Sequence, residues 1–120
     1  MPGSLLRVAT QGNDDTVVIH CAGELDTRVV DGLHRAIDRA CTAELSFLRI
    51  DAVDVTFIDS TGLACLLEAK RRCEELGATL EIVPSRPVAQ LFDLTAAPIR
   101  RGRPQRQTFL RMPRPKREGG

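Results

Sequence analysis

The sequence predicts a single α/β domain whose mixed β-sheet combines an N-terminal hairpin with parallel strands and has helices packed against it. The length of 120 residues suits one globular domain with one core. Two apolar, β-rich runs near the N-terminus are separated by a turn-rich stretch, which is typical of a hairpin. After residue 23, helix-like and strand-like segments alternate with short connections, as they do where helices join parallel strands.

The hairpin is predicted from the runs LLRVAT at residues 5–10 and TVVIHCAG at residues 16–23, which flank the turn-rich QGNDD. The stretch DTRVVDGLHRAIDRAC, residues 26–41, predicts a helix with Thr27 as its N-terminal cap. Its apolar residues recur at three- and four-residue steps and are Val30, Leu33, Ile37 and Cys41. The other positions are mostly polar, so one face of this helix is expected to be buried.

The second half of the domain repeats the alternation. SFLRIDAVDV at residues 46–55 predicts a strand covered by helices, and TFIDSTGL at 56–63 predicts a crossing from strand to helix. That helix is expected to end at Gly77, a residue suited to a left-handed C-cap. Its predicted inner side consists of Leu63, Leu66, Leu67, Cys73 and Leu76. A strand at 78–84 and a short helix at 86–97 follow.

Charge divides the chain into a domain of residues 1–99 and a tail of residues 100–120. Residues 1–99 hold nine Lys or Arg and fifteen Asp or Glu, a net charge of −6, whereas the tail holds eight Lys or Arg and one Glu, a net charge of +7. The tail is rich in Arg and Pro, so it is expected to be largely disordered. It can attract nucleic acid by charge, but Phe109 is its only aromatic residue, so no specific nucleic-acid partner is predicted.

Several kinds of enzyme chemistry are disfavoured by motifs that the sequence lacks. It has no G-x-x-x-x-G-K-[ST] or G-x-G-x-x-G phosphate-binding loop and no nucleophile elbow of the form G-x-S-x-G. His20 falls within an apolar run and His34 on a polar helix face, where structural or solvated roles are expected. The sequence therefore predicts a protein that is not an enzyme, with no catalytic residue and no cofactor.

Metal and membrane sites are disfavoured as well. Asp51, Asp54 and Asp59 are carboxylates of the kind that hold Mg²⁺, but solvated and capping acids are more common, so no metal site is predicted. The four cysteines form no C-x-x-C pair, and each is expected to be a small buried hydrophobe. No apolar run approaches the roughly 20 residues of a membrane span, and no leader-like segment follows Met1, so a cytoplasmic location is expected.

Ser60, in the stretch TFIDSTGL, has two interpretations that fit the local residues. Serine is a preferred helix N-cap, and a helix N-terminus is also a favourable position for a phosphate. A phosphate on Ser60 would add about −1.5 to −2 charges beside Asp59. A hydroxyl at an interface would then become a hydrated anion, whose desolvation opposes the binding of a partner. Ser60 is thus a candidate cap and a candidate switch.

Three segments of the sequence occur in one order: AGELD at 22–26, VTFIDSTGL at 55–63 and VAQLFDLT at 88–95. Together they resemble the STAS domain family, and most closely its stand-alone bacterial anti-sigma factor antagonists. The resemblance covers about residues 5–99. A DST triplet alone would be weak, but its place behind an apolar strand and between the other two segments is specific.

The resemblance implies a function for this chain. In such antagonists the first hydroxyl after the aspartate is phosphorylated with ATP by the partner, an anti-sigma factor serine kinase; here that position is Ser60, and Thr61 is a secondary candidate. The unphosphorylated antagonist binds the anti-sigma factor and frees the sigma factor, and a serine phosphatase resets it. The partner surface implied by the resemblance consists of Asp26, Asp59, Ser60, Thr61 and Gly62. Each of the two aspartates can equally cap its own helix.

A second function stays open, that of a STAS accessory or docking subunit of a transporter or lipid-transfer complex without a kinase cycle. The chain also departs from the family pattern, which usually continues with a last strand and a C-terminal helix. Here Ile99 is followed by the basic tail, and Ala96 stands where a glycine is common. The way in which the sheet edge is covered is therefore left open by the sequence.

Overall fold

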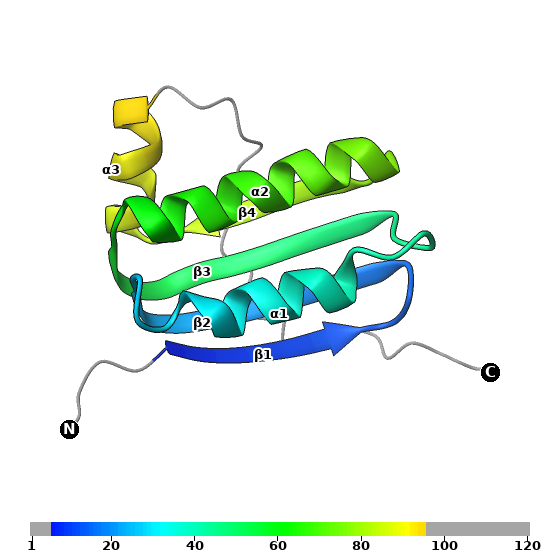
Figure 1. Ribbon diagram of the computed structural model, residues 1–120, viewed down its shortest axis with the longest axis horizontal. Helices are drawn as coiled ribbons and strands as arrows, with labels where there is room; N and C mark the ends of the chain where they lie inside the picture. Colours follow the sequence, from blue (N-terminus) through cyan, green and yellow to red (C-terminus); the bar gives the residue numbers. More distant parts are fainter. Residues whose placement is uncertain (1–5, 96–120) are drawn as a thin grey trace.

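Within residues 6–95, four strands form one sheet and lie side by side in chain order (Figure 1). The computed structural model describes residues 6–95, with the side chains of residues 6–93. The elements are β1 (Leu6–Gly12), β2 (Thr16–Leu25), α1 (Val30–Ala40), β3 (Phe47–Ile58), α2 (Ser60–Leu76), β4 (Thr79–Pro84) and α3 (Arg86–Thr95). β1 pairs antiparallel with β2, whereas β2 pairs parallel with β3 and β3 with β4. The predicted α/β class and mixed sheet are confirmed.

A tight turn joins β1 to β2. Gly12 has a φ of +119°, and a Cβ at this position would lie 2.1 Å from the backbone oxygen of Thr16, so the turn excludes a side chain here. The side-chain oxygen of Asn13 accepts hydrogen bonds from the N–H groups of Asp15 at 3.1 Å and Thr16 at 3.0 Å. The turn-rich QGNDD thus closes the predicted hairpin through local interactions.

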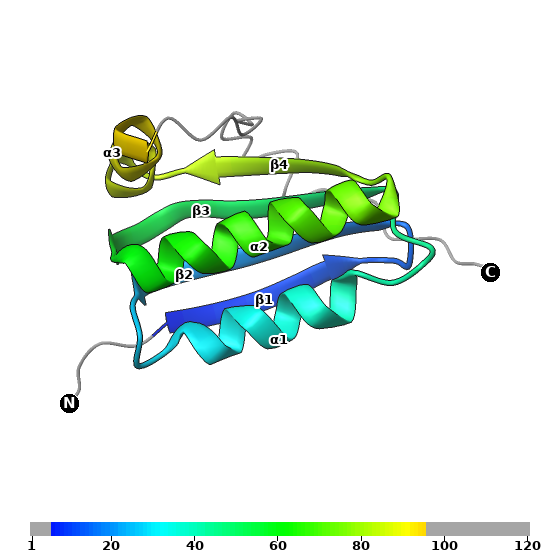
Figure 2. The same cartoon turned by 45° about the horizontal axis from the view of Figure 1, so that its top comes forward.

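Helices α1 and α2 lie on one face of the sheet, and α3 lies at the end of β4 (Figures 1 and 2). One cluster of apolar side chains joins this face of the strands to the helices. Its fully buried members include Ile19, Leu25, Leu33, Ile37, Leu48, Ile50, Leu66 and Ile82. α3 adds Val88 and Phe92 to the same cluster. Each large side chain buried in this way contributes about 1.5–3 kcal/mol to folding.

The length of β3 creates a strand end that β4 does not reach. β4 pairs with β3 only as far as Ala52, whereas β3 continues beside β2 until Ile58 pairs with Leu25. Two register shifts interrupt this second half of the β2–β3 pairing, and such bulges re-aim the side chains that follow them. Because β2 and β3 are parallel, their carboxyl ends lie at the same edge, where the chain turns into α1 and α2.

The start of α1 differs from the prediction, and Thr27 does not cap it. α1 begins at Val30, after Val29, and its N-terminus has no side-chain cap hydrogen bond. The backbone oxygen of Asp26 instead accepts hydrogen bonds from the N–H groups of Val29 at 3.1 Å and Val30 at 3.0 Å. The prediction was wrong because residues 27–29 form a turn of their own before the helix, which periodicity alone does not reveal.

The boundaries predicted for α2 are confirmed, but its predicted inner side is too long. Gly77 follows the helix in the left-handed conformation, with a φ of +73°. Leu76 was predicted to face inward and is 37% exposed. The reason is that Cys73 is the last residue of α2 in the apolar cluster, so the final turn of the helix extends past the core. Leu67 is half-buried against the cluster.

Some predictions concern residues that the structure does not describe. Ala96, Ile99 and the tail of residues 100–120 lie outside residues 6–95, as does the predicted boundary between domain and tail. Among the residues that are described, no helix is both long enough and apolar enough to cross a membrane.

Candidate functional site at the carboxyl ends of β2 and β3

Ser60 is the first residue of α2, and a single residue separates it from the end of β3. That residue, Asp59, has an extended backbone and is the N-cap: its Oδ1 accepts a hydrogen bond from the N–H of Gly62 at 3.0 Å. The capping role therefore belongs to Asp59 and not to Ser60. The Ser60 side chain is exposed and has no hydrogen bond to any described residue. Its hydroxyl is thus accessible to a partner or a modifying enzyme.

The neighbouring hydroxyl of Thr61 is in a different environment. Thr61 is half-buried, and its Oγ1 lies 2.9 Å from Oγ1 of Thr27, at hydrogen-bonding distance. Thr27 belongs to the turn between β2 and α1, so this bond connects the two chain segments that leave the sheet at this edge. Of the two candidate hydroxyls, Ser60 is the accessible one and Thr61 is held in a tertiary contact.

Asp26 holds the turn that follows β2. Its Oδ1 accepts a hydrogen bond from the Arg28 N–H and its Oδ2 one from the Arg28 guanidinium, each at 3.0 Å. The guanidinium bond is the main reason why the pKa of Asp26 is lowered from its ordinary value. The residue is 8% exposed, so its carboxylate faces the turn more than the solvent. Asp26 thus fixes the conformation of this turn by orienting Arg28, which also lies 3.8 Å from Glu24.

Gly62 packs inward. It is buried, and a Cβ at this position would lie 2.5 Å from the backbone oxygen and 2.7 Å from Cγ of Leu25. Only glycine allows the first turn of α2 to approach the end of β2 this closely. The Asp59 N–H also donates to the Leu25 backbone oxygen, at 3.3 Å. Gly62 was predicted as part of a partner surface, and the structure buries it against Leu25, so that it supports the helix turn to which Ser60 and Thr61 belong.

Sequence reasoning missed an apolar feature next to the site. Phe57 is 48% exposed and Val53 is 39% exposed, and both lie in the half of β3 that extends past β4. Ile58 is buried, so the alternation of side chains along a strand turns Phe57 outward, which is the signal that could have found it. Phe57 precedes Ser60 by only three residues, so an exposed apolar side chain is available for contact on the same stretch of chain.

The remaining candidate groups do not form a reactive centre in the described residues. No cluster of His, Cys, Asp or Glu suited to a metal is found among them. Oδ2 of Asp51 lies 3.3 Å from Nδ1 of His20, and burial lowers the pKa of this imidazole, so it is mainly neutral at pH 7, whereas Asp59 is the helix cap. Burial raises the pKa of three cysteine thiols to about 12, so they are protonated and poorly nucleophilic at neutral pH; these are Cys21, Cys65 and Cys73. Cys41 is half-buried.

Solved structures with this fold include bacterial regulators. The chain is similar to the anti-sigma factor antagonist SpoIIAA in its unphosphorylated form, with a TM-score of 0.73 and 20% identity over 87% of this chain and 93% of that chain. It is similar to an anti-sigma factor antagonist from Mycobacterium paratuberculosis, with a TM-score of 0.67 and 23% identity over 76% of this chain and 78% of that one. It is also similar to the Bacillus cell fate determinant SpoIIAA in the phosphorylated form, with a TM-score of 0.71 and 20% identity over 87% of this chain and 96% of that chain.

At these identities the likeness concerns the fold. A search of curated proteins found no match. The family model of the STAS domain, however, matches residues 7–98, which include the described strands and helices apart from Leu6, and the Ser60 site. The chain therefore belongs to the STAS domain family.

Proposed function

We propose that this protein is an anti-sigma factor antagonist that is switched by phosphorylation of Ser60. In the unmodified state it binds an anti-sigma factor that is also a serine kinase, and the sigma factor is released. Transfer of a phosphoryl group from ATP to Ser60 ends this binding, and a serine phosphatase restores it. The observation that carries the proposal is the exposed Ser60 hydroxyl at the start of α2, directly after the capping Asp59. Such a cycle operates in the cytoplasm.

The geometry supports Ser60 as the acceptor over Thr61. A kinase must reach the hydroxyl, and Ser60 is exposed whereas Thr61 is half-buried and bonded to Thr27. A phosphate on Ser60 would lie at the positive end of the α2 dipole, so the fold can retain it without unfolding. The phosphate would also add about −1.5 to −2 charges to the proposed partner-binding surface, and this added charge would oppose partner binding.

The partner surface that we propose has an exposed centre and a supporting layer. Ser60 and the apolar Phe57 are exposed and available for direct contact. Asp26 and Asp59 hold the two turns through hydrogen bonds of their own carboxylates. Gly62 permits the close approach of α2 to β2. This division supports direct contact for the first pair and a positioning role for the others.

The test is phosphoryl transfer from ATP by the anti-sigma kinase encoded nearest to this gene, followed by mapping of the phosphate by mass spectrometry. We expect phosphate on Ser60, none on Ser60→Ala, and unchanged labelling of Thr61→Val. Labelling that persists on Ser60→Ala would reject the site. Co-purification with subunits of a membrane transporter, and with no soluble kinase, would favour the accessory-subunit function instead.

A further inference from the structure

Two of the four cysteines meet where α1 and α2 lie side by side on one face of the sheet (Figures 1 and 2). Cys41 directly follows α1 and is its C-cap, and Cys73 lies near the end of α2. The two thiols are in hydrogen-bonding contact. Cys73 is a member of the core cluster, and Cys41 packs against that cluster. The tertiary structure thus brings together two thiols that are distant in the sequence.

An ion pair beside these thiols holds the two helices together at this point. The Arg72 guanidinium donates to the Asp38 carboxylate. Arg72 directly precedes Cys73 in α2, and Asp38 lies about one helical turn before Cys41. The contact between Cys41 and Cys73 is therefore supported by an interaction of their neighbours and does not depend on the thiols alone.

Cys41 and Cys73 differ in their access to solvent. Cys41 is half-buried, whereas Cys73 is buried. Burial raises the pKa of Cys41 from its ordinary value, and the Arg72 guanidinium and the hydrogen bond with Cys73 act in the opposite direction. Burial raises the pKa of Cys73 to about 12. A small oxidant in solution therefore reaches Cys41 first, and Cys73 is the neighbouring thiol behind it.

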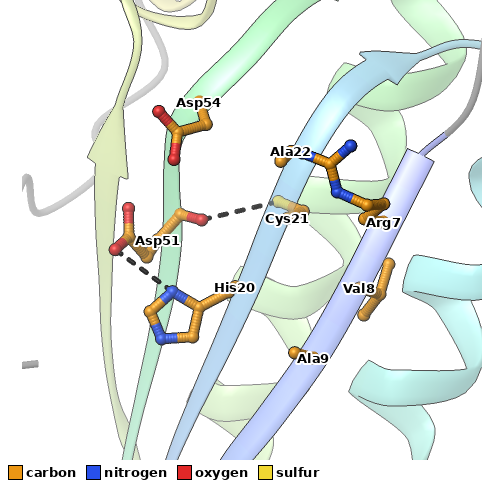
Figure 3. A pocket seen from close by; sticks show the side chains of 8 residues that line it. All are labelled: Arg7, Val8, Ala9, His20, Cys21, Ala22, Asp51 and Asp54. Atoms are coloured by element: carbon orange, nitrogen blue, oxygen red, sulfur yellow. Dashed lines mark hydrogen bonds and ion pairs between the residues drawn. The ribbon is translucent and has the colours of Figure 1, made fainter. Parts of the chain in front are cut away.

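The other two cysteines are in different surroundings. Cys21 lies at the wall of a pocket of about 530 Å³ between β1, β2 and β3, where its thiol donates to the Asp51 backbone oxygen at 3.7 Å (Figure 3). Cys65 is 1% exposed and belongs to the core cluster. Cys21 is thus bonded to the backbone and Cys65 is enclosed by apolar side chains, which makes Cys41 and Cys73 the pair that can react.

We propose that Cys41 and Cys73 are an oxidation site at which a peroxide converts the two thiols into a disulfide between α1 and α2. The Cys41 sulfur first attacks one oxygen of hydrogen peroxide, the O–O bond breaks, and Cys41 becomes a sulfenic acid while water leaves with the Cys41 thiol proton. The Cys73 sulfur then attacks the Cys41 sulfur, the S–O bond breaks, and a second water leaves with the Cys73 thiol proton. In total the two thiols lose two electrons and two protons, and one hydrogen peroxide is reduced to two water molecules.

The disulfide requires a small adjustment of the backbone, and Cys41 is placed to make it. A disulfide brings its two sulfur atoms to about 2.05 Å, closer than two thiols in hydrogen-bonding contact. Cys73 is fixed within α2, whereas Cys41 lies outside α1 with a ψ of 73°. The chain at Cys41 can therefore shift toward Cys73 while both helices stay intact.

The oxidation site is separate from Ser60. Ser60 and Cys73 lie near opposite ends of α2, about 20 Å apart along its axis at 1.5 Å per residue. The inference therefore does not rest on the proposed phosphorylation. A disulfide between Cys41 and Cys73 closes a loop of chain that contains β3 and Ser60, which restricts the unfolded chain and so stabilises the domain. The pair is a place of modification and not a catalytic centre.

Treatment of the folded full chain with hydrogen peroxide, followed by alkylation in denaturant and tryptic mass spectrometry, tests this proposal. Trypsin places each of the four cysteines on a separate peptide, so every possible pairing is distinguishable. We expect the peptides of Cys41 and Cys73 to be linked to each other, and those of Cys21 and Cys65 to carry the alkyl group. The midpoint of thermal unfolding of the oxidised chain should rise by at least about 5 °C, and dithiothreitol should reverse this rise.

Two variants test the order of the steps. Cys73→Ala should leave Cys41 as a sulfenic acid that dimedone labels, whereas Cys65→Ala, the same change at another buried cysteine of α2, should still form the disulfide. Circular dichroism shows whether each variant is folded, and the mapping of the unchanged chain does not depend on either. Oxidation of Cys41 beyond the sulfenic acid while Cys73 remains alkylated would overturn the proposal. A disulfide between two chains, or thiols that react only after denaturant is added, would overturn it as well.

Discussion

Oγ1 of Thr27 lies 2.9 Å from Oγ1 of Thr61, so a hydrogen bond joins the turn after β2 to the first turn of α2. The two residues are 34 positions apart in the chain. This contact explains why Thr61, although it neighbours Ser60 in the motif, is not an equivalent acceptor. It also makes the edge of the sheet that carries Ser60 a single structural unit.

Removal of this bond should destabilise the domain by a measurable amount. Thr27→Val and Thr61→Val each lose a partner, and a double-mutant cycle should give a coupling free energy of about 0.5–1 kcal/mol, as for one hydrogen bond between neutral groups. The measurement is urea unfolding of the four proteins. Thr42→Val, at an exposed threonine in the turn after α1, is the control. Strict additivity of the two substitutions would show that the bond contributes nothing.

The N-cap of α2, Asp59, should contribute measurably to the stability of the domain. Asp59→Ala removes the acceptor for the Gly62 N–H and should lower the free energy of unfolding by about 1 kcal/mol, whereas Asp59→Asn should cost less because asparagine also caps. Urea unfolding compares both with Asp14→Ala, in the exposed turn between β1 and β2. Equal stabilities of Asp59→Ala and Asp14→Ala would argue against the capping role.

Two helical glycines should respond oppositely to alanine. Gly62→Ala brings a Cβ to 2.5 Å from the Leu25 backbone oxygen and should cost about 1–3 kcal/mol. In Gly32→Ala, in α1, the nearest atom is the Val8 Cγ2 at 3.8 Å, an ordinary contact, so helix propensity should stabilise the protein by about 0.5–1 kcal/mol. Thermal unfolding followed by circular dichroism distinguishes the two. A stable Gly62→Ala protein would refute the close packing of α2 against β2.

The acid sensitivity of folding should depend on Asp26. The Arg28 guanidinium lowers the pKa of this carboxyl from its ordinary value of 3.8. A lowered pKa in the folded state means that the contribution to stability is present above about pH 3.8 and is lost as the pH falls below it. Asp26→Asn should therefore flatten the loss of stability in this acidic range. Asp14→Asn, in the exposed turn between β1 and β2, is measured in the same urea series as the control for the loss of one carboxylate.

A negative charge at Ser60 should weaken partner binding if the proposed function holds. Ser60→Asp should reduce affinity for the anti-sigma factor by about tenfold or more, because like charges and desolvation are costly at an interface. Ser60→Ala should bind with unchanged affinity whether or not the kinase has ATP. Ser46→Asp, an exposed serine just before β3, controls for added charge. Equal binding of Ser60→Asp and the unmodified protein, by isothermal calorimetry, would contradict the switch.

Several features of the site were predictable because they depend on neighbours in the sequence. The strand-to-helix crossing at TFIDSTGL and the C-cap at Gly77 rest on local backbone preferences and were located correctly. The start of α1 was not, because an Asp26-centred turn and a Thr27 cap fit the same residues, and the hydrogen bonds of the turn decided between them. Leu76 was misplaced because periodicity does not tell where the core ends.

The sequence by itself determined the order of strands and helices, the mixed hairpin and parallel pairing, and the position of Ser60 where the strand crosses into the helix. These features follow from hydrophobic periodicity, from the composition of turns and from short sequence motifs, all of which are local patterns of neighbouring residues. Only the tertiary structure decided that Asp59 is the cap of α2, that Thr61 is bonded and Ser60 is accessible, and that Gly62 lies against Leu25. Those properties depend on contacts between residues far apart in the chain, and a one-dimensional pattern does not encode which distant atoms meet.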